Sequence, residues 1–134
     1  MLYLSHSALT EFTEMHDSFF EVWKQVMNSG DTSVVERFCE DYYVTFFMGT
    51  EQKPKFFNRE ESVEGMKQSV HSLLGATKRF ENRVIRLRNE NNGVVFYELV
   101  LEKEGIELAR LFTIENWKRI GDQWLLSREI AESI

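Results

Sequence analysis

The run Asn92-Gly93-Val94-Val95-Phe96-Tyr97-Glu98-Leu99-Val100-Leu101 predicts a β-hairpin turn followed by a strand. Asn-Gly is the strongest short hairpin signal, because both residues tolerate the positive φ that a two-residue turn requires. The residues after the turn are apolar or aromatic except for Glu98, and such a run is typical of a strand. A carboxylate inside it is costly to bury unless it is paired or used. Glu98 is therefore the first candidate for a functional residue.

The part of the chain that precedes this hairpin predicts three helices. Apolar side chains three and four residues apart predict a helix over 7–29, with Gly30 suited to end it. Ser33-x-x-Glu36 has the pattern of a capping box and predicts a short helix through Cys39. Asn58-x-x-Glu61 repeats the pattern and predicts a longer helix before Gly75.

The other segments predict one early strand and a run of hairpins. Residues 42–48 are aromatic and β-branched, which favours a strand, and 50–57 has the polar composition of a loop. Glu104-Gly105 and Gly121-Asp122 are plausible two-residue turns, so the chain after Lys78 predicts four antiparallel strands. Helices laid on a curved antiparallel sheet, an α+β fold, are the expected architecture.

Pairing the strands through these turns predicts which side chains share a face. It places Glu98 opposite Leu87 and Leu111, and Glu115 opposite Arg128. The face that holds them also contains a polar Thr113 among the apolar residues Ile85, Leu87, Phe96, Val100, Leu111, Trp117, Leu126 and Ile130. The opposite face is apolar too. We therefore expect helices to cover one face and a second copy of the chain to cover much of the other, as a homodimer.

Composition and charge narrow the class of protein. A length of 134 residues with 43% hydrophobic residues predicts one globular domain. The net charge of -6 argues against nucleic acid and anionic membranes as partners. Cys39 is the single cysteine, which excludes an internal disulfide and a cysteine zinc site. No signal-peptide pattern, membrane-spanning run or phosphate-binding loop is found, so we expect a cytoplasmic protein without metal or cofactor.

Three local patterns resemble the nuclear transport factor two-like superfamily. They are the helix entry 57–63, the glycine-ended strand 43–49 and the last hairpin 117–124. This superfamily includes SnoaL-like cyclases, ketosteroid isomerases and scytalone dehydratase. The resemblance implies one SnoaL-like domain over 1–134, a conical, cystatin-like fold with the three helices on the concave face of the sheet. It also implies a pocket between helices and sheet, and dimerisation through the convex face.

The resemblance also implies where the pocket lies. The spacing of Trp117 and Trp124 resembles that in the association domain of calcium/calmodulin-dependent kinases, where the position two before the first tryptophan lines the pocket. That position is Glu115, and the predicted pairing would bring Glu98 to the same side. Ketosteroid isomerase activity is disfavoured, because residues 45–49 contain no acid and Thr113 stands where a strand acid is expected.

These patterns favour a domain that binds a small apolar or carbonyl-bearing molecule. It would be a cofactor-independent isomerase, cyclase or dehydratase that acts by acid/base chemistry. The expected catalytic residues are Glu98, Arg128 and Glu115, and the expected substrate-binding residues are Thr113, Trp117, Phe96, Leu111, Trp23 and His16. In the alternative interpretation, Glu115 and Arg128 form a structural ion pair and His16 is a core histidine. The protein would then be a non-catalytic ligand-sensing or dimeric assembly module.

Overall fold

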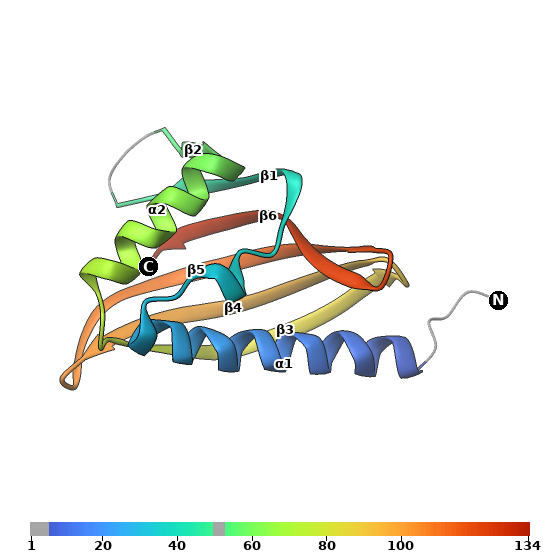
Figure 1. The fold of residues 1–134 in the computed structure, drawn as a ribbon, viewed down its shortest axis with the longest axis horizontal. Helices are drawn as coiled ribbons and strands as arrows, with labels where there is room; N and C mark the ends of the chain where they lie inside the picture. Colours follow the sequence, from blue (N-terminus) through green and yellow to red (C-terminus); the bar gives the residue numbers. More distant parts are fainter. Residues whose placement is uncertain (1–5, 50–52) are drawn as a thin grey trace.

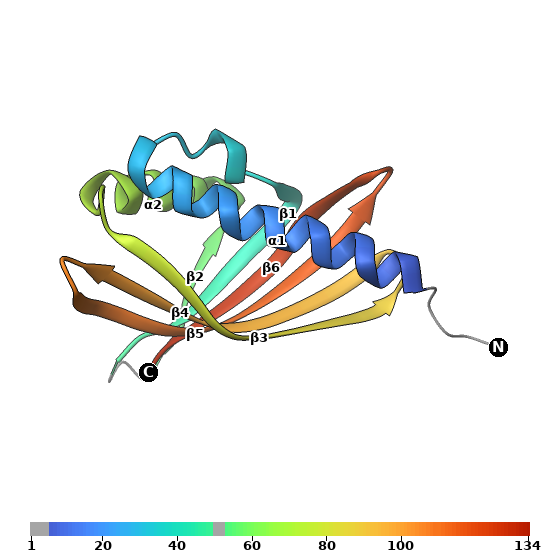
Figure 2. The ribbon, with the colours of Figure 1, turned by 90° about the horizontal axis from the view of Figure 1, so that it is seen from below.

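The computed structural model describes residues 6–49 and 53–134 of the chain. Within them, two α-helices lie on the same side of a six-stranded, curved sheet (Figures 1 and 2). No helix in this part of the chain is long and apolar enough to cross a membrane. In chain order the elements are α1 (His6–Ser29), the 3-10 turn η1 (Ser33–Val35), β1 (Phe38–Phe47), β2 (Lys55–Asn58), α2 (Arg59–Ser72), β3 (Thr77–Asn89), β4 (Asn92–Lys103), β5 (Ile106–Ile120) and β6 (Gln123–Ser133).

The sheet has the strand order β2-β1-β6-β5-β4-β3. The predicted hairpins β3–β4, β4–β5 and β5–β6 are antiparallel, but β1 runs parallel to β6. The prediction of a wholly antiparallel sheet is therefore wrong at one pair. Parallel neighbours need a long connection, and here α2 and four strands separate the two partners in the chain.

The predicted third helix does not form. Only Ser33–Val35 makes a single 3-10 turn, and Phe38 already begins β1. The capping box fails because Glu36 accepts a hydrogen bond from the Thr32 hydroxyl at 2.8 Å instead of turning back to the cap backbone. The predicted loop is also partly wrong, because Lys55–Asn58 pairs with β1 as β2, while positions 50–52 lie outside the described residues.

The capping box of α2 is confirmed. The Asn58 side chain accepts from the Glu61 backbone N–H at 2.9 Å, and the Glu61 side chain accepts from the Asn58 N–H at 3.0 Å. We expect Asn58→Ala to lower the free energy of unfolding by about 1 kcal/mol, measured by thermal or urea denaturation. Asn28→Ala, at an exposed position of α1, is the control and should leave stability nearly unchanged. Equal losses in both variants would contradict this role of the cap.

The predicted turn at Asn92-Gly93 is wrong by two residues. The turn is formed by Glu90 and Asn91, and Gly93 lies inside β4 opposite Leu87. Gly93 lies directly under Phe12 of α1, and a Cβ there would come within 2.5 Å of the ring. The glycine is therefore used for close helix–sheet packing, which is an alternative to its role in a turn.

The turns at Glu104-Gly105 and Gly121-Asp122 form as predicted, but two β-bulges change the registers beyond them. One bulge follows Leu101 and puts Glu98 opposite Phe112. The other lies next to Asn116 and puts Glu129 opposite Glu115. Because one extra residue moves the following side chains to the other face, Glu98 and Glu115 lie on opposite faces of the sheet.

Candidate functional site

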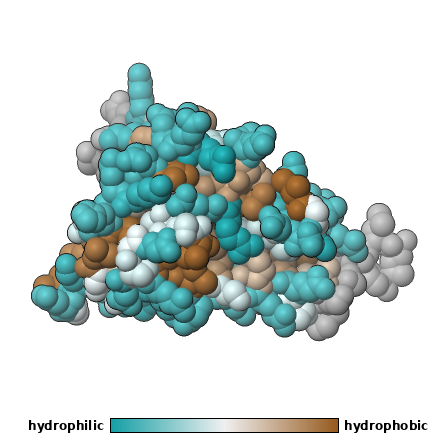
Figure 3. Space-filling view, in the orientation of Figure 1, coloured by the Kyte–Doolittle hydropathy of each residue, from teal (hydrophilic) through white to brown (hydrophobic). Residues whose placement is uncertain are grey.

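A cavity of about 460 Å³ lies between the concave face of the sheet and the helices α1 and α2. Its walls are mostly aromatic and aliphatic, and its charged lining residues are Glu61, Lys78, Glu115 and Glu129. The outer surface on the helix side is mostly hydrophilic, with smaller apolar patches (Figure 3). Size and lining match those of pockets that bind small molecules.

Glu115 is buried at the wall of this cavity and accepts three hydrogen bonds. Its Oε1 accepts from His16 Nε2 at 2.7 Å and from Trp117 Nε1 at 2.9 Å, and its Oε2 accepts from the Tyr97 hydroxyl at 2.6 Å. The carboxylate and the histidine are both almost inaccessible to water. The three donors hold the carboxylate in one position, which is how a buried charge is made tolerable.

A second contact fixes the tautomer of His16. Arg83 NH1 lies 3.2 Å from His16 Nδ1, and Arg83 NH2 donates to Asp17 at 2.6 Å. A guanidinium can only donate, so Nδ1 accepts and the ring proton is on Nε2, where it is donated to Glu115. A chain of hydrogen bonds thus runs from the cavity wall through the core to Asp17 at the surface.

Glu129, on β6, is the second carboxylate of the cavity. It is half-buried, and its Oε1 accepts from the Tyr42 hydroxyl at 2.8 Å. Burial raises the pKa of Glu129 to about 8, and repulsion by Glu115 adds to the increase, while Tyr42 and Lys78 oppose it. A carboxyl that titrates in this range can take up or release a proton near neutral pH.

Lys78, on β3, is the cation of the cavity lining. Its Nζ lies 3.2 Å from the centre of the Trp23 ring, a close cation–π contact. Burial lowers the pKa of Lys78 to about 8, although attraction by Glu129 and Glu115 partly compensates. The cavity therefore contains an acid and a base whose pKa values have both moved toward neutrality.

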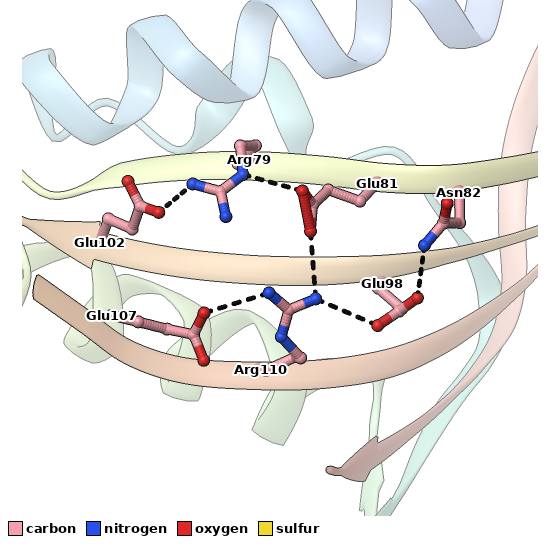
Figure 4. Close-up of polar contacts among 7 residues, drawn as sticks. All are labelled: Arg79, Glu81, Asn82, Glu98, Glu102, Glu107 and Arg110. Atoms are coloured by element: carbon pink, nitrogen blue, oxygen red, sulfur yellow. Dashed lines mark hydrogen bonds and ion pairs between the residues drawn. The ribbon is translucent and has the colours of Figure 1, made fainter. Parts of the chain in front are cut away.

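Glu98 lies on the convex face, within an ion network on β3, β4 and β5 (Figure 4). It accepts from Arg110 at 3.1 Å and from Asn82 at 2.6 Å. Three carboxylates around Arg110 raise the pKa of its guanidinium. The network covers Val100, which is fully buried although it points away from the core. It is completed by Arg79, Glu81, Glu102 and Glu107.

The structure separates the predicted site residues into three groups. Trp23, Leu111, Thr113 and Glu115 line the cavity. His16 and Trp117 are buried behind Glu115 and bonded to it. The prediction that Phe96, Glu98 and Arg128 lie on the same face as Glu115 is wrong. The two bulges reverse the alternation of side chains, so these three residues lie on the convex face. Arg128 is exposed and donates to Asn116 there, away from Glu115.

Sequence reasoning missed Tyr42, Lys78 and Glu129. The bulge next to Asn116 is what turns Glu129 inward, and nothing in the local sequence marks it. Tyr42 could have been found, since it belongs to a predicted strand whose face follows from its alternation with Val44. Within residues 6–49 and 53–134, no group of three or more His, Cys, Asp and Glu side chains is arranged to hold a metal ion.

Comparison with known proteins rests on structure alone, because no family model and no curated protein matches the sequence. An NTF2-like protein of unknown function from Pseudomonas putida KT2440 is 9% identical with a TM-score of 0.72, over 97% of this chain and 89% of that one. A protein of unknown function with a cystatin-like fold, from Nostoc punctiforme, is 16% identical with a TM-score of 0.67, over 99% and 96%.

A candidate ketosteroid isomerase from Parabacteroides distasonis is 17% identical with a TM-score of 0.63, over 90% of this chain and 86% of that one. At such identities a match shows the fold and leaves the activity open, because one fold hosts many functions. With its curved sheet and its two helices on one face, this chain has the NTF2-like, cystatin-like fold, as its resemblance to that superfamily implies.

Proposed function

We propose that the cavity binds a small apolar molecule with a carbonyl group and that Glu129 transfers a proton on it. The reaction class would be a cofactor-independent isomerisation, cyclisation or dehydration, carried out by one domain spanning residues 1–134. The observation that carries the proposal is the half-buried Glu129 carboxyl at the cavity wall, with a pKa of about 8. Acid/base catalysis is most effective when the pKa of the group is close to the working pH.

The surroundings of Glu129 support this role. The Tyr42 hydroxyl donates a 2.8 Å hydrogen bond to Oε1 of Glu129 and does not engage Oε2. Glu115 is held in place, because its oxygens accept hydrogen bonds from His16, Tyr97 and Trp117. Two acids in one cavity with different environments can have different roles, here Glu129 as the proton carrier and Glu115 as a group held by three hydrogen bonds. Glu98 is no part of this proposal, since it lies on the other face.

Exchange of α-protons for deuterium tests the proposal. The probe is 2-tetralone, an apolar bicyclic ketone, and the loss of its α-proton signal in D₂O is to be followed by NMR. The wild type should accelerate exchange, and Glu129→Gln should reduce the protein-catalysed rate by roughly a hundredfold, because the amide cannot accept the proton. The matched control is Glu98→Gln on the convex face, which should keep the wild-type rate.

Equal exchange rates in Glu129→Gln and wild type would overturn the role of Glu129. Binding of 2-tetralone is measured separately, by quenching of the fluorescence of Trp23 at the cavity. A Glu129→Gln protein that binds the ketone as the wild type does, but no longer exchanges its protons, would separate the chemical step from binding.

A second candidate function is a dimeric assembly module, and a specific feature of the convex face favours it. Register partners on all six strands form one row of largely apolar side chains across this face. At its ends, Val84 is 40% and Phe56 is 61% exposed. We propose that a second copy of the chain covers the row, which consists of Val84, Phe96, Ile114, Ile130, Thr45 and Phe56.

Light scattering coupled to size exclusion tests this dimer. Ile114 lies in the middle of the row, and Ile114→Lys should convert a dimer to a monomer, because a buried interface cannot accept an unpaired ammonium. Ile120→Lys is the control, since Ile120 is exposed at the end of β5 beside the turn and away from the row. A monomeric wild type would refute the proposed dimer.

A further inference from the structure

Neighbouring residues on β3 place two cations in opposite surroundings. Arg79 points to the convex face, where Glu81 and Glu102 pair with its guanidinium. Lys78 points to the concave face and lines the cavity, where Trp23 covers its Nζ. Within the described part of the chain, Lys78 makes no ion pair.

The two carboxylates whose charges act on Lys78, Glu115 and Glu129, are engaged elsewhere. Glu115 accepts from His16, Tyr97 and Trp117, and Glu129 accepts from Tyr42. They attract Lys78 only through space. An ammonium in an apolar cavity without a paired carboxylate loses its proton more easily, because the neutral amine is the form that burial favours.

We propose that Lys78 is a nucleophilic amine that forms an imine with an aldehyde or ketone bound in the cavity. This inference rests on the proposed function for its cavity and ligand class, and it adds a covalent step on a second residue. Desolvated lysines in apolar sites are the ones that form such bonds with carbonyl substrates.

The step balances without a cofactor. The lone pair of the neutral Lys78 Nζ attacks the carbonyl carbon. Nζ loses one of its two protons and the carbonyl oxygen gains one, which gives a carbinolamine. Nζ then gives up its remaining proton while the hydroxyl leaves as water, so that a C=N bond replaces the C=O bond. One amine and one carbonyl compound yield one imine and one water molecule, and no oxidant or reductant is needed.

The contact with Trp23 fits this reactivity. Lys78 and Trp23 both line the cavity, and Nζ lies 3.2 Å from the centre of the ring. Loss of the proton gives up a cation–π contact but breaks no ion pair. With a pKa of about 8, roughly a tenth of the side chain is the free amine at pH 7, whereas for an ordinary lysine it is less than about a thousandth.

Reductive trapping tests the imine. The intact protein is incubated with 2-naphthaldehyde and sodium cyanoborohydride near neutral pH, and attachment is followed by intact mass and located by peptide mass spectrometry. Lys78 should be labelled roughly tenfold faster, or more, than each of the other six lysines, which serve as internal references. Excess 2-tetralone should slow labelling of Lys78 and leave the other lysines unaffected.

Two variants separate the reactive amine from its charge. Lys78→Arg keeps a cation over Trp23 but cannot form an imine, so the fast labelling should disappear. Lys118→Arg changes an exposed lysine of β5 and should leave labelling of Lys78 unchanged. If Lys78→Arg does not fold, the wild type still decides, since labelling spread evenly over the lysines overturns the proposal.

The failures of the two proposals are distinguishable. If 2-naphthaldehyde does not label Lys78 preferentially while Glu129→Gln still abolishes exchange on 2-tetralone, the imine is wrong and the proton transfer stands. If Lys78 is labelled preferentially but Glu129→Gln exchanges like the wild type, the imine stands and the role of Glu129 is wrong.

Discussion

Glu115→Ala should lower the free energy of unfolding by about 3–5 kcal/mol. The substitution leaves the donors of His16, Tyr97 and Trp117 without an acceptor in a part of the core that water hardly reaches. The completely buried His16 ring then keeps only its contact with Arg83. The loss comes from three buried polar groups at once, and it adds to the cost of the space left by the side chain.

Two further variants show whether the hydrogen bonds cause this loss. Glu115→Gln should cost clearly less, because the amide oxygen can accept from His16 and Trp117 while the amide N–H₂ faces the Tyr97 hydroxyl, which can accept. Glu98→Ala removes a carboxylate from a neighbouring strand on the convex face, where it is 26% exposed, and should cost about 1 kcal/mol or less.

Urea denaturation of the three variants and the wild type, with a common m-value, gives the comparison. A loss for Glu115→Ala that is no larger than the loss for Glu98→Ala would contradict the central place of Glu115 in the core. A loss for Glu115→Gln as large as that for Glu115→Ala would instead mean that its charge, more than its hydrogen bonds, stabilises the fold.

Features set by neighbouring residues were predictable from the sequence. The long first helix follows from the spacing of its apolar residues, and the start of α2 follows from Asn58 and Glu61, whose side chains reach only three residues along the chain. The turns at Glu104-Gly105 and Gly121-Asp122 are likewise local. Ser33-x-x-Glu36 shows the limit, because Thr32 competes for the same carboxylate and the helix is lost.

Registers and faces depend on contacts between distant residues. Gly93 joins a strand because Phe12, far away in the sequence, packs on it. The bulge after Leu101 and the one beside Asn116 each reverse the faces of the strand residues beyond them, so Glu98 was assigned to the pocket and Glu129 to the outside. The Glu98 carboxylate within an apolar run correctly indicates a polar network. Only the folded structure shows on which face of the sheet this network lies.

The pocket chemistry was predictable only as a class. Glu115 was chosen through a tryptophan spacing, yet its bond to His16 joins residues 99 positions apart. The pKa values of Glu129 and Lys78 are set by burial and by each other's charges, which a sequence does not show. The sequence does list the titratable residues, and the fold determines which of them come together in the cavity.

Glu129→Gln should stabilise the protein at about pH 8 and change its stability little at about pH 5. The pKa of Glu129 is about 8 in the folded protein, against an ordinary value of 4.5. Between these values the folded state keeps a proton that the unfolded state releases, so the stability of the wild type falls as the pH rises. Across the whole window the difference between variant and wild type should grow by on the order of 3–5 kcal/mol.

Denaturant unfolding of both proteins at several values between about pH 5 and 8 measures this difference. The comparison stays below the pH range in which Lys78 changes the stability. The lowered pKa of Lys78 makes the wild type more stable only as the pH rises from about 8 to 10.5. The matched control is Glu132→Gln on the same strand, where the side chain is exposed to water. If the two glutamine variants gave parallel curves, the Glu129 carboxyl would be an ordinary surface acid, and the proton transfer assigned to it would lose its physical basis.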